Sequence, residues 1–191
     1  MNKNSINKPT QISDKERLLK EKASKIKIMA FDVDGVFTDG SLVFDENGKE
    51  YKTFNAKDGQ GIVCVEKAGI ITVIITARNN GTVEHRAKNL GITELHQGVK
   101  YKLPVLEEIV KKQGLNMENV SYMGDDLPDI CILEKVGLAC CPADAVDEVQ
   151  NICHFVSSKN GGRGAIRELC DFVLRSQNIE PLDIVRSAHK C

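Results

Sequence analysis

The sequence predicts an α/β protein in three layers, with a parallel sheet covered by helices on both faces. Nearly continuous apolar runs of strand length, of which ITVIIT (71–76) is typical, alternate along the chain with helical patterns. Strands buried on both faces are apolar throughout, and helical crossovers join them in parallel. Acidic and hydroxyl side chains follow these runs, at the edge where open parallel sheets bind their ligands. The two observations together predict the fold and the place of its site.

The chain of 191 residues opens with a polar, lysine-rich extension, residues 1–25. Its first dozen residues are expected to be disordered, and the segment DKERLLKEKASK is charged and helical in character. The main domain is expected to span residues 26–175, and the polar tail 176–191 is expected to be mobile.

The elements of the domain follow in order from their patterns. Short runs of strand length, mostly apolar, predict strands at 26–31, 71–76, 94–97 and 120–124. The helical patterns between and after them predict helices near 59–68, 80–90, 101–113 and 127–135. Two more short strands, near 137–140 and 153–156, and a helix near 163–175 complete the domain.

One segment interrupts this rhythm, SLVFDENGKEYKTF (41–54). It consists of two alternating stretches around Asn47-Gly48, and Asn-Gly between alternating hydrophobic residues is a strong hairpin signal. The hairpin directly follows the first strand and its two aspartates, so we expect it to lie as a flap over their site.

Composition narrows the class of protein. The chain has 26 basic and 27 acidic residues and a net charge of −1, so no basic excess indicates a nucleic-acid partner. No apolar run approaches the length of a bilayer span, and the N-terminus has no signal-peptide core, so no membrane association is expected. Seven scattered cysteines without a CxxC pair argue against a disulfide framework and a zinc site. We therefore expect a reducing, cytoplasmic location.

Reactive side chains are expected to converge at the carboxyl ends of the strands. Asp32 and Asp34 follow the first strand, Thr76 ends the second, and Lys102 begins the helix after the third. The sequence Gly-Asp-Asp at 124–126 follows the fourth strand. Parallel strands bring these residues to one edge of the sheet.

This set of residues suits the hydrolysis of a phosphate monoester. Asp32 is the expected nucleophile, forming an aspartyl phosphate, and Asp34 the general acid and base. Thr76 and Lys102 are expected to hold the phosphoryl oxygens. An all-oxygen site suits Mg²⁺, whose expected ligands are Asp32, the backbone carbonyl of Asp34, and Asp125.

Two features of the set leave alternatives open. Asp126 or Asp129 could support the metal shell, and only one of them is needed. Each residue taken singly also has an ordinary interpretation, as a turn, a strand residue, an exposed helix residue or an N-cap. Their occurrence in order at successive strand ends favours a reaction site over chance.

These motifs resemble the haloacid dehalogenase (HAD) superfamily of phosphotransferases, as DVDG (32–35), Thr76, Lys102 and GDD (124–126). The longer stretches are similar to the minimal-cap family of 3-deoxy-D-manno-octulosonate 8-phosphate (KDO 8-phosphate) phosphatases. They are DVDGVFTDG, FNAKDGQGI (54–62), ITAR (75–78), LGITELHQGVKYK (90–102), YMGDD (122–126) and GGRGAIRE (161–168).

The resemblance covers roughly residues 26–175 and implies a Rossmann-like, HAD-like fold in which the hairpin is a small cap. It also implies a Mg²⁺ cofactor and a homotetramer, in which the hairpins form a central barrel and neighbouring subunits help to close each site. The implied reaction is hydrolysis of a phosphorylated sugar acid, KDO 8-phosphate, in lipopolysaccharide precursor synthesis.

Further site residues follow from the resemblance, position by position. It implies that the substrate-contact stretch is NAKDG, namely Asn55, Ala56, Lys57, Asp58 and Gly59. Arg78 and Arg86 match family arginines, and Lys102 matches the phosphate-binding lysine. Arginine binds carboxylates in a bidentate way, which suits a sugar acid. The resemblance also implies a loop near the mouth of the site at GGRGAIRE, with Arg163 as a contact across subunits.

Two positions depart from the family pattern. Ala77 stands where the family usually has glycine, and Val63 where it often has an arginine. The second departure removes a candidate cation for the sugar carboxylate. A phosphatase for a nine-carbon 2-keto-3-deoxy sugar acid 9-phosphate is therefore the nearest alternative.

Two other classes compete. A signalling receiver domain would carry its phosphorylated Asp after the third strand, where this chain has His96-Gln97-Gly98, and we reject it. A catalytically silent oligomerisation domain is the other class, and the intact set of site residues argues against it.

Overall fold

The computed structural model describes residues 13–189, so the expected disorder of the first dozen residues lies outside the described part. Its centre is a six-stranded sheet in the order β5-β4-β1-β6-β7-β8, in which all neighbouring strands are parallel. The strands are β1 (Ile28–Phe31), β4 (Ile71–Ile75), β5 (Glu94–His96), β6 (Val120–Met123), β7 (Leu138–Cys141) and β8 (Phe155–Val156). Phe31 pairs in register with Ile74 and with Met123, so the central strands end at one edge.

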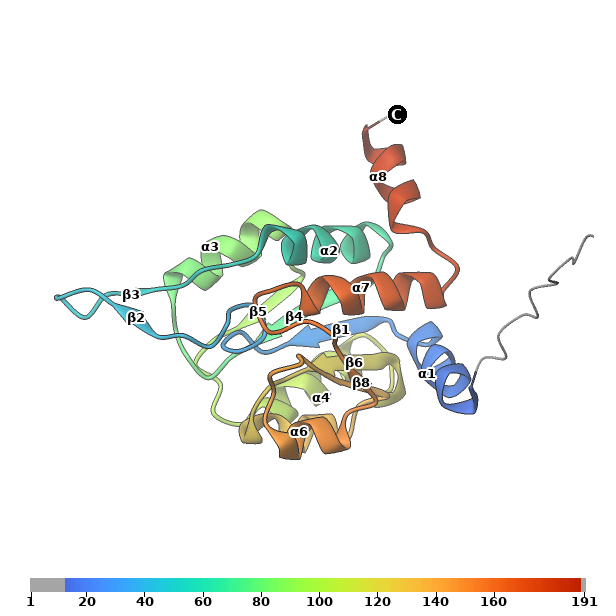
Figure 1. The fold of residues 1–191 in the computed structure, drawn as a ribbon, viewed down its shortest axis with the longest axis horizontal. Coiled ribbons are helices and arrows are strands. Elements are labelled where there is room, and N and C mark those ends of the chain that lie inside the picture. Colours follow the sequence, from blue (N-terminus) through green and yellow to red (C-terminus); the bar gives the residue numbers. More distant parts are fainter. Residues whose placement is uncertain (1–12, 190–191) are drawn as a thin grey trace, which may run out of the picture.

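Helices cover both faces of the sheet, with α2 and α7 on one side and α4 and α6 on the other (Figure 1). Those of the domain are α2 (Ala56–Lys67), α3 (Gly81–Leu90), α4 (Lys102–Lys112), α5 (Ile130–Leu133), α6 (Asp147–Ile152) and α7 (Ala165–Ser176). Two more flank it, α1 (Asp14–Ser24) and α8 (Pro181–His189), and the 3₁₀ turns are η1 (Met117–Asn119) and η2 (Leu127–Asp129).

Alternation along β1 divides the apolar core into two clusters. Met29 and Phe31 pack with buried residues of α1, α2, α3 and α7, whereas Ile28 and Ala30 pack with those of α4, α5 and α6. Successive side chains of a strand point to opposite faces, so a strand that is apolar at every position can bury both. The predicted three-layer α/β fold is confirmed.

The structure differs from the sequence-based expectation at three elements. The helix predicted near 127–135 is a 3₁₀ turn followed by the short α5, with Pro128 inside that turn. Two helices were not predicted: the six-residue α6, and α8 in the expected polar tail. Ile184 and Val185 of α8 pack against the core, which is contact that the mixed sequence of the tail does not reveal.

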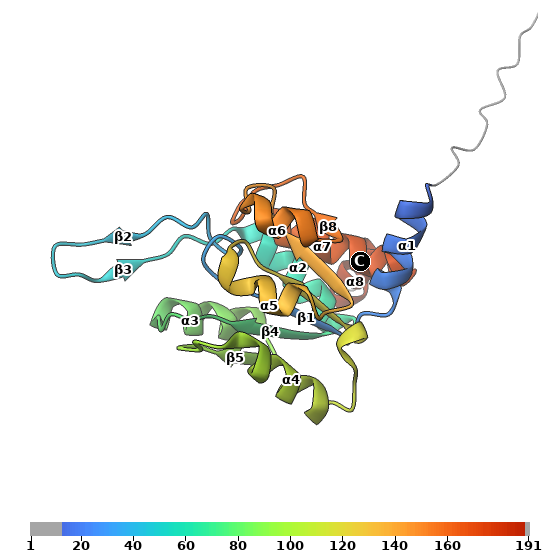
Figure 2. The same cartoon turned by 90° about the horizontal axis from the view of Figure 1, so that it is seen from below.

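The predicted hairpin is present as β2 (Val43–Phe44) paired antiparallel with β3 (Glu50–Tyr51). It extends well beyond the domain in both views (Figures 1 and 2). Gly48 at its tip has φ of +78°, a conformation that glycine adopts without strain. Its apolar side chains are 48% to 54% exposed, namely Leu42, Val43, Phe44 and Tyr51.

Within residues 13–189, none of the helices has the length and apolar character needed to cross a membrane.

Candidate functional site

A cavity of about 310 Å³ lies at the carboxyl edge of the sheet. The sequence-predicted residues that line it are Asp32, Asp34, Thr76, Arg78, Lys102 and Asp125, together with Asp126 and Asp129. Ala77, the departure from the family pattern, lines it as well. The central residues of the predicted site therefore lie together, at the strand ends where the sequence placed them.

Asp32 is fixed at the end of β1 by contacts on both carboxylate oxygens. The amide of Val33 donates a hydrogen bond of 2.7 Å to Oδ1, and the Lys102 ammonium lies 2.8 Å from Oδ2. Burial raises the pKa of Asp32 to about 6; the charge of Asp129 adds to this effect and Lys102 opposes it. A carboxylate held in one orientation beside a cation is suited to attack an anionic phosphoryl group.

Three carboxylates form an acidic cluster that could hold a cation. Oxygen atoms of Asp32, Asp125 and Asp129 all lie within 4.8 Å of one another. Burial, together with the charges of Asp32 and Asp129, raises the pKa of Asp125 to about 8. Its buried Oδ1 has no hydrogen-bond partner among the described residues. An orphaned carboxylate oxygen within an all-oxygen donor set fits a hard divalent cation such as Mg²⁺.

The two candidates for supporting the metal shell make different contacts. Asp126 is the N-cap of η2 and accepts a hydrogen bond from the Leu127 amide at 2.7 Å. Asp129, the buried member of the cluster, accepts a hydrogen bond from the Asp125 backbone amide at 3.1 Å. Asp129 therefore contacts the backbone of Asp125, and both the choice of supporting residue and the metal contact of the Asp34 carbonyl stay predictions.

Lys102 is the cation of this buried group. It begins α4, and its Nζ lies 2.8 Å from Asp32 and 2.7 Å from Asp129. Burial alone would lower the pKa of Lys102, but Asp32 and Asp129 raise it above the ordinary value. The Tyr122 hydroxyl donates a 2.7 Å hydrogen bond to Asp129 and accepts one of 3.3 Å from Lys102, so Tyr122 holds both partners of this ion pair.

Thr76 follows β4 with its side chain buried at the cavity wall. Its Oγ1 accepts a 3.3 Å hydrogen bond from the Arg78 amide. The hydroxyl hydrogen remains available to an oxygen in the cavity, as the predicted phosphoryl-anchoring role requires.

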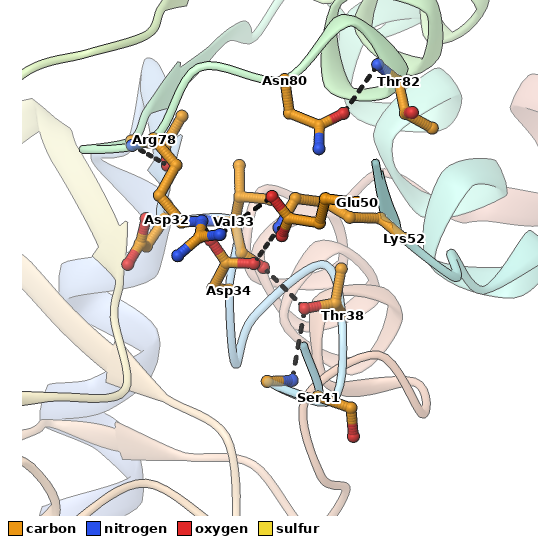
Figure 3. Close-up of polar contacts among 12 residues, drawn as sticks. Asp32, Val33, Asp34, Thr38, Ser41, Glu50, Lys52, Arg78, Asn80 and Thr82 are labelled. Carbon is orange, nitrogen blue, oxygen red and sulfur yellow. Dashed lines mark hydrogen bonds and ion pairs between the residues drawn. The ribbon is translucent and has the colours of Figure 1, made fainter. Parts of the chain in front are cut away.

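Asp34 and Arg78 are joined to two hairpin residues that sequence reasoning missed (Figure 3). Lys52 donates a hydrogen bond to Asp34 and another, of 2.9 Å, to Glu50. Glu50 in turn accepts a 2.9 Å bond from Arg78. Hydrogen bonds from Lys52 and Arg78 lower the pKa of Glu50 to about 2. Because alternate residues of a strand share a face, the hairpin pattern already placed Glu50 and Lys52 together.

The predicted substrate-contact stretch lies outside the cavity lining. Asn55 is the N-cap of α2, and Ala56 and Lys57 are exposed. Asp58 is buried and accepts hydrogen bonds of 3.1 and 2.9 Å from the Gly164 and Arg167 amides. It therefore joins α2 to the start of α7.

Arg86 lies against the same stretch. Its Nη2 donates to the Asn55 carbonyl at 3.3 Å, and a Cβ on Gly59 would come within 2.2 Å of that nitrogen. The predicted residues at 55–59 and Arg86 are thus neighbours of each other. None of them lines the cavity of the described structure, so their role in substrate binding stays a prediction.

The loop at GGRGAIRE supports the loop that carries Asp32 and Asp34. A Cβ on Gly161 would lie only 1.8 Å from the Gly35 carbonyl oxygen, so the two backbones touch. The Gly162 amide donates a 2.9 Å hydrogen bond to the Val36 carbonyl. Arg163 pairs with Asp39 of its own chain at 2.9 Å, on the surface.

Comparisons with known proteins agree with this geometry. Residues 95–169 match the family model of the haloacid dehalogenase-like hydrolases. The 3-deoxy-D-manno-octulosonate 8-phosphate phosphatase KdsC of Escherichia coli K12 is 44% identical over 156 residues, 82% of this chain and 83% of that protein.

Two solved structures are similar over most of both chains. One is the phosphatase of this name from Yersinia pestis, with a TM-score of 0.83 and 39% identity over 87% of this chain and 89% of that one. The other, from Moraxella catarrhalis in complex with magnesium, phosphate and KDO, has a TM-score of 0.84 and 35% identity, covering 90% and 97% of the two chains. The chain therefore belongs to the 3-deoxy-D-manno-octulosonate 8-phosphate phosphatase family of the haloacid dehalogenase-like hydrolases.

Proposed function

We propose that the protein hydrolyses KDO 8-phosphate to KDO and phosphate through an aspartyl phosphate on Asp32. The observation that carries this proposal is the fixed Asp32 carboxylate beside Lys102, in a cavity that Asp34 and Thr76 also line. Membership of the family and the magnesium, phosphate and KDO in the Moraxella relative support the choice of ester and cofactor.

In the first step, a carboxylate oxygen of Asp32 attacks phosphorus and the bond to the sugar oxygen breaks. Asp34 gives its proton to that departing oxygen, and Thr76 and Lys102 hold phosphoryl oxygens. Asp32, Asp125 and the Asp34 carbonyl would hold Mg²⁺, with Asp129 orienting Asp125, and the ion would offset the charge of the phosphoryl group.

In the second step, water attacks the phosphorus of the aspartyl phosphate and Asp34 takes a proton from it. The bond between phosphorus and Asp32 breaks, so phosphate leaves and both carboxyl groups return to their starting forms. Asp34 therefore acts first as acid and then as base.

Arg78 lines the cavity and is our candidate for the carboxylate of the sugar acid. We place the contacts of Asn55, Ala56, Lys57, Asp58, Gly59 and Arg86 across a subunit boundary, in a homotetramer built on the hairpins. The half-exposed apolar residues of β2 and β3 support this assembly, because such side chains gain from being covered.

We assign the phosphatase domain to residues 26–175, with 41–54 as its flap and flanking segments at 1–25 and 176–191. We place its work in the cytoplasm, in lipopolysaccharide precursor synthesis. The six cysteines of the described part are free thiols, which suits a reducing compartment.

The nine-carbon 9-phosphate ester is the second candidate, because Val63 packs against the apolar core where the family often has an arginine. Phosphate release from both esters, with Mg²⁺ and with a chelator, separates the candidates. We expect Mg²⁺-dependent release with a higher kcat/KM for KDO 8-phosphate. Equal or faster turnover of the nine-carbon ester would overturn KDO 8-phosphate as the proposed substrate. Equal phosphate release in the presence of the chelator would overturn the requirement for Mg²⁺.

A further inference from the structure

We propose that Lys52 and Glu50 of the hairpin are positioning residues for the reaction, which hold the Asp34 carboxylate and the Arg78 guanidinium in place. The inference rests on the proposed function of Asp34 as acid and base. It makes the hairpin part of the catalytic apparatus.

The four side chains form a closed ring of alternating charge (Figure 3). Lys52 contacts Asp34 and lies 2.9 Å from Glu50; Glu50 lies 2.9 Å from Arg78; and Arg78 Nε lies 3.8 Å from Asp34 Oδ2. Two members come from the hairpin and two from the loops that follow β1 and β4. The ring therefore ties the hairpin to both strand ends.

Lys52 turns its side chain inward, as Glu50 does. The Lys52 side chain is 1% exposed and that of Glu50 is 12% exposed, whereas the whole residues Val43, Phe44 and Tyr51 of the hairpin strands are 48% to 54% exposed. Burying an ammonium is costly, and a buried ion pair seldom stabilises a fold more than apolar residues would. A lysine and a glutamate turned inward on a hairpin whose apolar residues are exposed thus indicate a role in the site.

Asp34 depends on Lys52 for its orientation. Among residues 13–189, Lys52 is the one hydrogen-bond donor to the Asp34 carboxylate, whereas Asp32 is held on both oxygens. Without Lys52 the Asp34 side chain could rotate away from the leaving oxygen. Proton transfer needs the two atoms within hydrogen-bond reach.

Glu50 orients Arg78 in a similar way. It binds Nη2, while the buried Nε has no hydrogen-bond partner within the described part of the chain. Arginine has five N–H donors in a planar fork, so fixing one edge aims the rest at the cavity that Arg78 lines.

A comparison of leaving groups tests this inference. A sugar alkoxide needs a proton as it departs, whereas p-nitrophenolate does not. The value of kcat/KM reports steps up to formation of the aspartyl phosphate. In Lys52→Met we expect kcat/KM to fall roughly 100-fold for KDO 8-phosphate and to change less than about 5-fold for p-nitrophenyl phosphate. A merely structural defect would lower both values together.

Lys49→Met is the matched control, because Lys49 is an exposed hairpin lysine whose ammonium lies over Tyr51. Thermal melting checks that each variant folds. If Lys52→Met does not fold, the nearly isosteric Glu50→Gln replaces it, with an expected loss of roughly 10-fold in kcat/KM for the sugar ester alone. Sugar-ester activity equal to that of Lys49→Met, or equal losses on both esters, would overturn the inference.

The proposed function can fail separately. If the wild type ignores KDO 8-phosphate but hydrolyses another sugar phosphate, the proposed substrate is wrong, and the same leaving-group comparison proceeds with that ester. If the wild type hydrolyses no ester, both proposals are overturned.

Discussion

Replacing Lys102 with methionine isolates the one ammonium that contacts the buried acidic cluster in the described structure. Its Nζ lies 2.8 Å from Asp32 and 2.7 Å from Asp129, and its side chain is 5% exposed. Methionine keeps most of the volume and removes the charge. The variant therefore leaves three neighbouring carboxylates without their cation.

The expected cost follows from the burial of the pair. Removing one partner of a buried ion pair costs roughly 3–5 kcal/mol of unfolding free energy. At about 2–4 °C per kcal/mol for a chain of this size, the melting temperature should fall by roughly 6–20 °C without metal. Mg²⁺ should recover much of this stability, because it can neutralise the same carboxylates, but kcat should stay lower by about 10²–10³-fold.

Differential scanning calorimetry with and without Mg²⁺, combined with phosphate release, measures both effects. Lys112→Met is the control. Lys112 is in the same helix, but its side chain is 70% exposed, and its Nζ lies 3.4 Å from Glu94 Oε1. We expect it to change stability by less than about 0.5 kcal/mol. If Lys102→Met had the same melting temperature as this control in the absence of metal, the reasoning would be refuted.

Three further predictions concern the cluster, its protonation and the hairpin. In Gly35→Ala, the new Cβ would lie 1.9 Å from Asp125 Oδ2 at φ of +77°, so Mg²⁺ affinity measured by calorimetry should fall at least about 10-fold; unchanged affinity would contradict the placement of Asp125. The pKa values of about 6 for Asp32 and about 8 for Asp125 exceed the usual 3.8 of an aspartate, so the metal-free folded protein holds protons that the unfolded chain has released. The stability of the metal-free protein should therefore fall as pH rises from about 4 to 8. Binding of Mg²⁺ at pH 7 should release about one proton. Calorimetry in buffers of different ionisation enthalpy measures this release, and binding without proton release would contradict the prediction. Phe44→Glu places a charge on a hairpin residue that is 53% exposed and should reduce the proposed tetramer to smaller species in light scattering, whereas a mass equal to that of the wild type would contradict a hairpin interface.

Much of the cavity was predictable because strand ends are a local feature of the sequence. Asp32, Thr76 and Lys102 directly follow or begin elements whose patterns are strong, and parallel pairing then brings them together. The different contacts of Asp126 and Asp129 were not predictable, because they depend on how η2 turns after Asp126.

The hydrophobic pattern of the sequence does not predict contacts between residues that are distant along the chain. Lys52 meets Asp34, which lies 18 residues earlier at the other end of the hairpin segment, and Asp58 meets the start of α7 more than a hundred residues later. The helix α8 forms in a tail of mixed composition, where packing against the core outweighs a weak local signal.

The central claim is that Asp32 carries the phosphoryl group during the reaction. Rapid acid quenching of the enzyme during turnover of KDO 8-phosphate with Mg²⁺, then borohydride reduction, converts an aspartyl phosphate to homoserine. Peptide mass spectrometry then locates the modified residue. We predict homoserine at residue 32 in the wild type and none in Asp32→Asn. Homoserine at residue 34 or 125, or turnover without homoserine at residue 32, would contradict the account.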